Sequence, residues 1–402
     1  MSLPLTGVKV IELSNYVAAP SAARILSDMG AEVIKIEAHG GDVWRSVSKN
    51  SIYNGTDLEN PMFDSLNIGK KSICLNAKDP KGMEVLMRML ETADVFITNT
   101  RVKSLIKLGL DSETLTKKFP HLVYCSMDGY GEKGPDADAP GFDSQAFWTR
   151  SGFLLDMAEA NSNYPVCSPT GIGDCVTGLV LVSGIMMALF ARQKTGRGDI
   201  VKTSLYSSAI WTMNSMVLRT QPKYKSPFPR TSVEEGALTR KYKCKDGKWF
   251  VIHVLDYNKD AHKVYDLLGI SEKVKEIGIV DAATKRTYNA ELSELCEQIF
   301  LTRDCAEWVS SFKAADLVAD SMYHFSEVST DEQAWANDFL EEFTFRSGET
   351  CAMPRTPIRM ASVPIVPSPP APLPGEQTDE ILRAYGFGED EILDMKNRGV
   401  VN

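Results

Sequence analysis

One aspartate stands where a glycine-punctuated turn opens into a long apolar segment. Residues 165–174 read PVCSPTGIGD, and residues 175–191 follow as an apolar run. Gly171 and Gly173 permit backbone conformations and close approaches that other residues cannot make. Asp174 suits the first turn of a helix, where a carboxylate meets unpaired N–H groups. Two interpretations stay open from this pattern: Asp174 is an ordinary helix cap, or its carboxylate is a nucleophile.

Other residue types supply no second catalytic apparatus. The five histidines are isolated from one another and from cysteines at metal-ligand spacing, so no metal site is predicted. The chain contains neither a G-x-S-x-G nucleophile elbow nor a Walker A phosphate loop. Its eight cysteines are scattered without a CxxC pair, which is typical of reduced thiols in a cytoplasmic protein. Asp174 and the basic residues near strand ends are what remain.

Length and charge limit the classes of protein and of partner. A chain of 402 residues can form two domains with sizeable cores. The formal charge of -9 argues against nucleic acid or an anionic membrane as the main partner. The N-terminus lacks the pattern of a secretory signal. The apolar run of residues 175–191 is shorter than the roughly 20 residues that span a bilayer, so a buried core helix is expected.

The first half of the chain alternates apolar strands with helical patterns. Strands are predicted at residues 8–13, 31–36, 71–75, 94–98, 122–127 and 200–203, with helices at 20–29, 79–91, 112–119 and 205–219. Such alternation predicts an α/β fold with a largely parallel sheet covered by helices. The first turn lacks a GxGxxG sequence, so dinucleotide binding with Glu37 at the ribose is not favoured.

Polar side chains follow several predicted strands, where ligands collect in parallel sheets. A long turn-rich loop covers residues 128–143. Two interpretations of the basic and amide residues stay open: they face one anionic ligand, or each is a solvated surface residue. The residues concerned are Lys70, Lys71, Lys78, Asn99, Arg101, Lys103 and Lys107.

The second half of the chain does not continue the alternation of strands and helices. Residues 221–230 hold three prolines and are taken as a linker. A hairpin is predicted at residues 241–254 with its turn at Asp246-Gly247, followed by helices near 261–268, 290–300 and 305–314. A proline-rich stretch at 363–374 precedes a last helix at 378–385, which has no core of its own and is expected to return to the first domain. The predicted boundaries are 1–222 and 331–402 for the large domain and 223–330 for a smaller α+β domain.

Seven ordered motifs give the chain its resemblance to a known family. They are VIKIE at 33–37, GKKS at 69–72, DVFITN at 94–99, PGFD at 140–143, GD at 173–174 with TG at 177–178, TGRG at 195–198 and PGEQT at 374–378. On these motifs the chain resembles the class III CoA-transferases over almost its whole length. The resemblance implies a Rossmann-like large domain built from both chain ends, a smaller α+β domain, and a homodimer of two interlocked rings.

The resemblance also implies roles for individual residues. Asp174 falls on the family's nucleophilic aspartate, and coenzyme A is a substrate rather than a permanently bound cofactor. Attack on an acyl-CoA thioester would give an aspartyl-acyl anhydride, and returning CoA would give an aspartyl-CoA thioester that an acceptor acid attacks. Backbone N–H groups near Asp174 and Gly236 would stabilise the oxyanions. The positions that line CoA or the reacting group are Val17, Ala18, Ala38, Leu75, Asn76, Ala77, Lys78, Asn99, Thr100, Arg101, Lys107, Pro140, Gly141, Phe142 and Asp143.

The chain departs from the family pattern at three places. Ala38 stands where a basic residue is common, with His39 next to it, and Thr100 stands where an aromatic residue is usual. The poly-glycine lid of formyl- and oxalyl-handling members is replaced by residues 233–237, VEEGA. This replacement favours the 2-hydroxyacid branch of amino-acid fermentation, with an acceptor such as (R)-2-hydroxyisocaproate or (R)-phenyllactate.

Two rival functions remain open. An α-methylacyl-CoA racemase shares the fold but needs a proton-carrying histidine where Phe142 stands. A non-catalytic CoA-binding module would have no need of Asp174 in its glycine frame. The acyl pocket is not fixed by the sequence, because each candidate aromatic or apolar residue could equally be core: Tyr16, Phe142, Phe147, Trp148, Met157 and Trp211.

Overall fold

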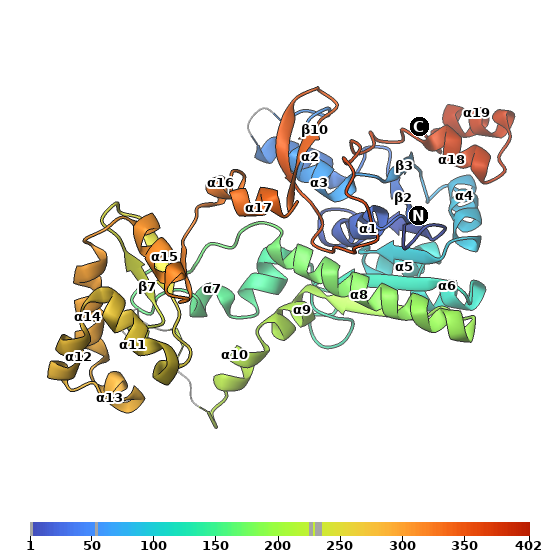
Figure 1. Cartoon of the computed structure of the whole chain (residues 1–402). Helices are drawn as coiled ribbons and strands as arrows, with labels where there is room; N and C mark the ends of the chain where they lie inside the picture. Colours follow the sequence, from blue (N-terminus) through green and yellow to red (C-terminus); the bar gives the residue numbers. More distant parts are fainter. Residues whose placement is uncertain (1–2, 53–54, 225–227, 230–234) are drawn as a thin grey trace. The chain divides into compact units, whose positions relative to one another are not determined.

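Contacts divide the chain into two units in the computed structural model, and each unit is described by itself (Figure 1). The structure describes residues 3–52, 55–224, 228–229 and 235–402. The first unit consists of Met1–Phe153, Cys167–Tyr224 and Glu332–Asn402, and the second of Leu154–Val166 and Lys225–Asp331. Residues 154–166, which the sequence placed in the large domain, belong to the second unit.

A parallel sheet forms the centre of the first unit. Within the described residues its six strands lie in the order β3-β2-β1-β4-β5-β6, and every neighbouring pair is parallel. The predicted α/β fold with a parallel sheet is therefore confirmed. The strands are β1 (Lys9–Leu13), β2 (Glu32–Glu37), β3 (Lys71–Cys74), β4 (Val95–Thr98), β5 (Val123–Asp128) and β6 (Ile200–Ser204).

The order of these strands reverses between β1 and β4. The chain passes from β1 outward to β2 and β3, then returns to β4 on the other side of β1. In open parallel sheets, the loops that follow the two strands at such a reversal leave the sheet in opposite directions at its carboxyl edge. This is the place where open parallel sheets bind their ligands.

Helices from both ends of the chain pack on this sheet. Side chains of β1, β2, β4 and β5 share one core with α4, α6, α18 and α19, while α1 packs against α8. The helices up to α6 are α1 (Ala18–Asp28), α2 (Val43–Ser51), α3 (Pro61–Asn67), α4 (Pro80–Glu91), α5 (Val102–Leu108) and α6 (Ser112–Lys118). The later elements are η1 (Asp143–Thr149), α7 (Phe153–Asp156), α8 (Ile172–Thr195), α9 (Leu205–Thr212), α10 (Asn214–Arg219), α17 (Glu332–Ala336), α18 (Thr378–Ala384), α19 (Glu389–Asn397) and the hairpin of β10 (Leu340–Thr344) and β11 (Thr350–Pro354).

The central apolar segment forms α8, which is longer than the sequence indicated. It has 24 residues and begins at Ile172, three residues before the predicted start. Gly178 lets it approach α1, because a Cβ there would overlap Ser21 Oγ and lie 2.9 Å from the Ala18 carbonyl oxygen. By length and composition, α8 is the one helix in the described part of the chain that could cross a membrane.

The second unit is a small α+β structure. Its antiparallel sheet has the order β7-β8-β9, and β7 and β8 form the predicted hairpin. Aromatic side chains fill its core, with Phe300 at 4.9 Å from Phe250 and 5.2 Å from Trp308 between ring centroids. The strands are β7 (Lys241–Lys243), β8 (Trp249–Ile252) and β9 (Ala319–Ser321), and the helices are α11 (Tyr257–Leu268), α12 (Ser271–Ile277), α13 (Ala282–Thr287), α14 (Asn289–Phe300), α15 (Cys305–Ala314) and α16 (Phe325–Val328).

One predicted helix is broken in the structure. The sequence predicted a continuous helix at residues 205–219, whereas α9 ends at Thr212 and α10 begins at Asn214. Met213 between them has φ -99° and ψ 18°, outside the helical range. The apolar pattern runs through both helices, so it carried no signal for the break.

Candidate active site

The parallel sheet brings most of the predicted site residues to one edge. Because all six described strands point the same way, their carboxyl ends meet along that edge. Val17 and Ala18 follow β1, Ala38 follows β2, and Leu75 to Lys78 follow β3. Asn99 to Arg101 follow β4, with Lys107 further along on α5, and the segment from Pro140 to Asp143 ends the loop after β5.

Asp174 lies in the first turn of α8, where glycines shape the entry. Gly171 is the N-cap and has φ 83°, in the left-handed region that glycine adopts without strain. A Cβ at Gly173 would overlap Phe147 Cγ and Asp143 Oδ1, so only glycine fits there. The first turn of α8 thus lies directly against the segment that carries Asp143.

The Asp143 side chain is hydrogen-bonded to this turn. Its Oδ2 accepts a hydrogen bond of 2.8 Å from the Gly171 N–H, and the side chain is buried. Burial raises the pKa of Asp143, while the N–H groups of Gly171, Gly173 and Asp174 and the Trp148 indole act in the opposite direction. A buried carboxylate therefore lies beside the second carboxylate, that of Asp174.

Asp174 itself has no fixed partner. Among the residues that the structure describes, none forms an ion pair or a hydrogen bond with its side chain. Burial raises the pKa of Asp174 to about 7, and the charge of Asp143 acts in the same direction. An exposed aspartate has a pKa of about 3.9 and is fully ionised at neutral pH, whereas Asp174 is only partly ionised there.

The turn after β1 forms a wall beside this carboxylate. Val17 Cγ1 lies 3.5 Å from the position of a Cβ at Gly171, and the Tyr16 ring meets the Phe142 ring edge-on at 5.3 Å between centroids. Phe142 is 54% exposed. Two more of the predicted aromatic residues, Phe147 and Trp148, lie on η1 and pack on each other at 5.9 Å.

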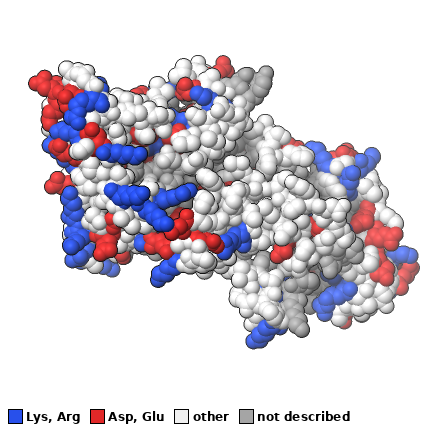
Figure 2. Space-filling model, turned by 180° about the vertical axis from the view of Figure 1, so that it is seen from behind, with Lys and Arg blue, Asp and Glu red and all other residues white. Residues whose placement is uncertain are grey.

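Only some of the predicted basic residues are free for an anionic ligand. On the face seen in Figure 2, lysine and arginine side chains lie among acidic ones, and many are paired. Lys70 is buried against Glu12, Lys71 pairs with Glu32 and Glu380, and Lys103 pairs with Asp138. The interpretation that all seven residues face one ligand is therefore wrong for these three. Within the described chain, Lys78, Arg101 and Lys107 are exposed and make no ion pair.

Three polar residues at or next to the predicted CoA positions are also engaged. His39, next to the exposed Ala38, hydrogen-bonds through Nδ1 to the Asn402 side chain. Asn99 binds the backbone of Asn15 with both ends of its amide, at 3.0 and 2.6 Å. Thr100 donates its N–H to Thr98 Oγ1 at 3.1 Å. Side-chain contacts from His39 or Asn99 to a ligand would have to compete with these bonds.

Part of the predicted lid lies outside the described residues, namely Val233 and Glu234. Gly236 and Ala237 belong to the second unit, where the Ala237 N–H donates to Asn289 Oδ1 at 2.8 Å. Met157 also belongs to the second unit, and Trp211 lies on α9 with 73% exposure. No group of three or more metal-ligating side chains occurs in the described ranges.

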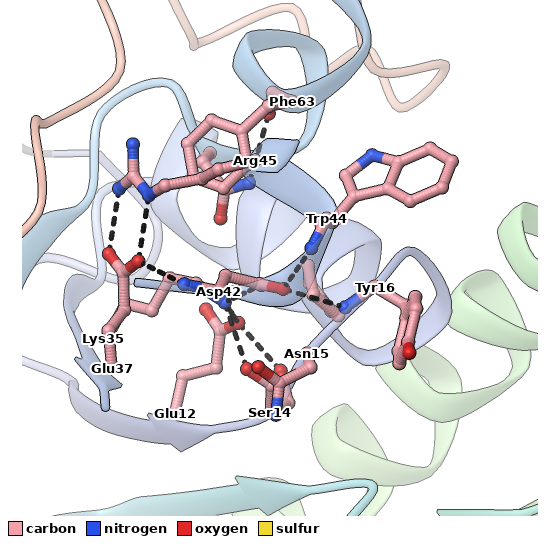
Figure 3. A network of polar contacts seen from close by, with 12 residues as sticks. Glu12, Ser14, Asn15, Tyr16, Lys35, Glu37, Asp42, Trp44, Arg45 and Phe63 are labelled. Atoms are coloured by element: carbon pink, nitrogen blue, oxygen red, sulfur yellow. Dashed lines mark hydrogen bonds and ion pairs between the residues drawn. The ribbon is translucent and has the colours of Figure 1, made fainter. Parts of the chain in front are cut away.

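A buried charge cluster under the turn was not foreseen. Glu12 on β1 and Lys35 on β2 are fully buried and paired at 2.9 Å (Figure 3). A signal was present, because each is a charged residue in the interior of its strand, between apolar neighbours. The structure adds Asp42 and Lys70 to this cluster.

Comparison with known proteins identifies the family. The model of CoA-transferase family III matches residues 5–378. The chain is 36% identical to (R)-2-hydroxy-4-methylpentanoate CoA-transferase of Clostridioides difficile, covering 99% of each chain. It is also 36% identical to cinnamoyl-CoA:phenyllactate CoA-transferase of Clostridium sporogenes, covering 97% of this chain and 95% of that one. The chain belongs to CoA-transferase family III.

Structural comparison agrees with this assignment. The crystal structure of Rv3272 from M. tuberculosis superposes with a TM-score of 0.83 at 26% identity, covering 95% of this chain and 99% of that one. The resemblance seen in the sequence motifs is confirmed, and the protein is an enzyme of the CoA-transferase class. The alternative of a non-catalytic CoA-binding module is therefore wrong.

The raised pKa of Asp174 predicts that the site lowers stability at alkaline pH. The folded-state value of about 7 lies above the ordinary 3.8. Between these values the folded protein keeps a proton that the unfolded chain has released, so stability falls as pH rises through this window and the loss is complete above pH 7. The Asp174→Asn side chain carries no charge. We therefore expect the free energy of unfolding of this variant to exceed that of wild type by about 1–3 kcal/mol at pH 8 and to equal it near pH 4.

Denaturant unfolding of wild type and Asp174→Asn at both pH values measures this difference. Glu294→Gln, which neutralises an exposed carboxylate on α14, serves as the control and should show no such change with pH. Equal stabilities of wild type and Asp174→Asn at pH 8 would contradict the burial argument.

Proposed function

We propose that this family III enzyme moves CoA from an acyl-CoA to a 2-hydroxy carboxylic acid, with Asp174 as the covalent nucleophile. The observation that carries the proposal is the unpaired Asp174 carboxylate at the glycine-shaped entry of α8. It stands beside the aromatic contact of Tyr16 and Phe142, at the carboxyl edge of the sheet. A carboxylate tied into an ion pair could not attack a thioester.

The reaction proceeds by successive acyl transfers through the carboxyl group of Asp174. Asp174 attacks the thioester carbonyl carbon, the C–S bond breaks, and CoA leaves as a thiolate, which leaves a mixed anhydride. The thiolate then attacks the Asp174 carbonyl carbon and releases the first acid as a carboxylate. The acceptor carboxylate attacks the resulting aspartyl thioester and releases the thiolate again. Attack of that thiolate on the acceptor carbonyl gives the new acyl-CoA and restores Asp174.

The environment of Asp174 suits this chemistry. Only the ionised form attacks, and a carboxylate whose pKa is raised to about 7 is more basic than an exposed one while still being substantially ionised at neutral pH. The N–H groups of Gly173 and Asp174 face the Asp143 carboxylate, so the donor that we propose for the developing oxyanion is the Ile172 N–H, which has no partner within the helix. A donor of this kind is worth on the order of 2.7–4 kcal/mol in the transition state.

CoA would lie along the carboxyl edge, with its phosphates near the three exposed cations. Lys78 follows β3, and Arg101 and Lys107 flank α5 after β4. We assign the other predicted contacts to backbone and shape, because Val17, Ala18 and Leu75 are buried and apolar. The segment from Pro140 to Asp143 would adjoin the thioester.

The acceptor class follows from the relatives and from the aromatic wall. Both relatives named above act on acids with bulky apolar side chains, by their names. Tyr16 and the exposed Phe142 offer apolar surface at this edge, whereas Phe147 and Trp148 on η1 are buried. A racemase would need a proton carrier where Phe142 stands, and a phenyl ring cannot serve.

An apolar surface on the first unit supports a homodimer, and the resemblance implies interlocked rings. Along α8 and α9, Met187, Phe190 and Trp211 are 70%, 61% and 73% exposed. Exposed apolar residues gathered on neighbouring helices favour a subunit interface over solvent. We propose that a second copy of this chain covers them, in an enzyme of the cytoplasm.

Asp174→Asn should abolish transfer while the fold stays intact, because the amide keeps the shape but is not a nucleophile. Transfer of CoA between butyryl-CoA and (R)-phenyllactate measures the activity, and circular dichroism checks the fold. In wild type, hydroxylamine should trap the aspartyl thioester at Asp174. Substantial turnover by the variant would remove Asp174 from this role.

Lys107→Ala should raise the KM for the acyl-CoA about fivefold or more and change kcat less than twofold, because it removes a contact made equally in ground and transition states. Lys71→Ala is the matched control. It also removes one exposed lysine, but at the amino end of β3, where Lys71 pairs with Glu32 and Glu380. A fall in kcat alone, or the same KM change in both variants, would exclude Lys107 as a phosphate contact.

The acceptor class is tested with a panel of acids and one acyl-CoA donor. We expect (R)-2-hydroxyisocaproate and (R)-phenyllactate to give kcat/KM values at least about tenfold above those of formate and carnitine, because a bulky apolar side chain buries more surface. Faster transfer to formate would contradict the proposed class.

Exchange of the α-proton of the acyl-CoA in deuterated water without any acceptor would instead indicate a racemase.

A further inference from the structure

The turn from Ser14 to Val17 is held by side chains rather than by regular secondary structure. It links β1 to α1, and Tyr16 within it has φ 67°, a left-handed conformation that is uncommon for a residue other than glycine. Such a conformation costs free energy and persists only where the surroundings impose it. What imposes it here is a set of contacts to consecutive backbone groups.

Three side chains bind four successive polar groups of this backbone. Lys35 Nζ donates to the Ser14 carbonyl oxygen at 3.0 Å. Asn99 accepts from the Asn15 N–H at 3.0 Å and donates to the Asn15 carbonyl oxygen at 2.6 Å. Asp42 Oδ1 accepts from the Tyr16 N–H at 3.1 Å. Figure 3 shows the Asp42 and Lys35 side chains converging on this turn.

A balanced set of buried charges fixes these side chains. Lys35 Nζ donates hydrogen bonds to Glu12 Oε1 at 2.9 Å and to the Ser14 carbonyl oxygen, and it forms an ion pair with Asp42 Oδ2 at 2.8 Å. Glu12 Oε2 pairs in turn with Lys70 at 2.8 Å. Two carboxylates therefore meet two ammonium groups, and all four are buried.

Stability alone gives a poor account of this cluster. Desolvation of buried ions offsets most of their attraction, and apolar residues of similar volume often stabilise a fold as well or better. A buried network does, however, fix geometry, because each member has its partners in one arrangement only. The contacts of the cluster converge on one turn, which indicates that geometry is what it supplies.

The turn in question borders the proposed reaction centre. The Tyr16 ring contacts Phe142 at 5.3 Å between centroids, and Val17 lies against Gly171 at the entry of α8. We propose that Asp42, Lys35 and Asn99 are positioning residues for CoA transfer: they hold the Tyr16 turn so that its ring, against Phe142, orients the acyl group at Asp174. This inference rests on the proposed function of Asp174.

Asp42→Asn is the sharpest single change. Asp42 uses one oxygen for the N–H groups of Tyr16 and Trp44 and the other for the Lys35 ammonium. An amide has one oxygen and one NH2 group, so either orientation places a donor against a donor. We expect kcat/KM for the acyl-CoA to fall about tenfold or more, since a small misplacement of a reacting group has effects of this size.

Glu341→Gln is the matched control. Glu341 is also buried and paired, with Arg355 at 3.0 Å, but it lies on β10, which contributes no residue to the candidate active site. If the cluster only stabilised the fold, both variants would lower the melting temperature and leave kcat and KM within twofold of wild type. That outcome would overturn the positioning role.

A double-mutant cycle separates positioning from general damage. If Asp42 acts through the Tyr16 ring, Asp42→Asn should change kcat/KM less than about threefold in a Tyr16→Ala background. If the fold-changes in kcat/KM of the two single variants simply multiplied in the double variant, the two residues would act independently and the proposal would be contradicted. Should Asp42→Asn fail to fold, Asn99→Ala takes its place in the same cycle. Loss of activity in Asp174→Asn tests the reaction centre itself. If Asp174→Asn is inactive while Asp42→Asn leaves the kinetics unchanged, only the positioning role is contradicted.

Discussion

The close approach of the first turn of α8 to the segment carrying Asp143 is the constraint on which the site depends. It exists because Gly173 has no side chain where Phe147 and Asp143 pack, and because Gly178 has none where α1 passes. Both contacts fix the helix axis relative to the sheet. As a result the backbone orients Asp174, whose side chain makes no hydrogen bond or ion pair with the residues that the structure describes.

Two carboxylates in the same unit, the buried one of Glu12 and the partly buried one of Asp174, have pKa values shifted in opposite directions. Around Glu12, burial would raise the pKa, but the ammonium groups of Lys35 and Lys70 hold it down to about 2. Around Asp174, burial and the like charge of Asp143 act together and raise the pKa to about 7. Desolvation is common to both, so the presence of a cation decides the outcome. The paired carboxylate belongs to the cluster that we propose fixes geometry, and the unpaired one is the proposed nucleophile.

The sequence predicted the elements of the fold better than the environment of individual charges. Apolar runs gave the six strands of the described sheet to within one or two residues, because a buried parallel strand is apolar on both faces. Gly171 and Asp174 marked the entry of α8 correctly. Lys70 was misplaced, because its burial depends on Glu12, which lies far away in sequence and next to it in space. No local pattern records such a pairing.

The occupied turn after β1 also explains which anions the sheet can bind, and where. In dinucleotide-binding sheets the first turn offers free N–H groups to a pyrophosphate. Here the N–H groups of Asn15 and Tyr16 are taken by Asn99 and Asp42, and Glu37, at the place of a ribose ligand, is bound on both oxygens by Arg45. The switch point is therefore closed to phosphate by the contacts that hold the Tyr16 turn. Under the proposed function, the phosphates of CoA would instead lie farther along the edge, where Lys78, Arg101 and Lys107 are exposed, and the acyl group would lie near Asp174.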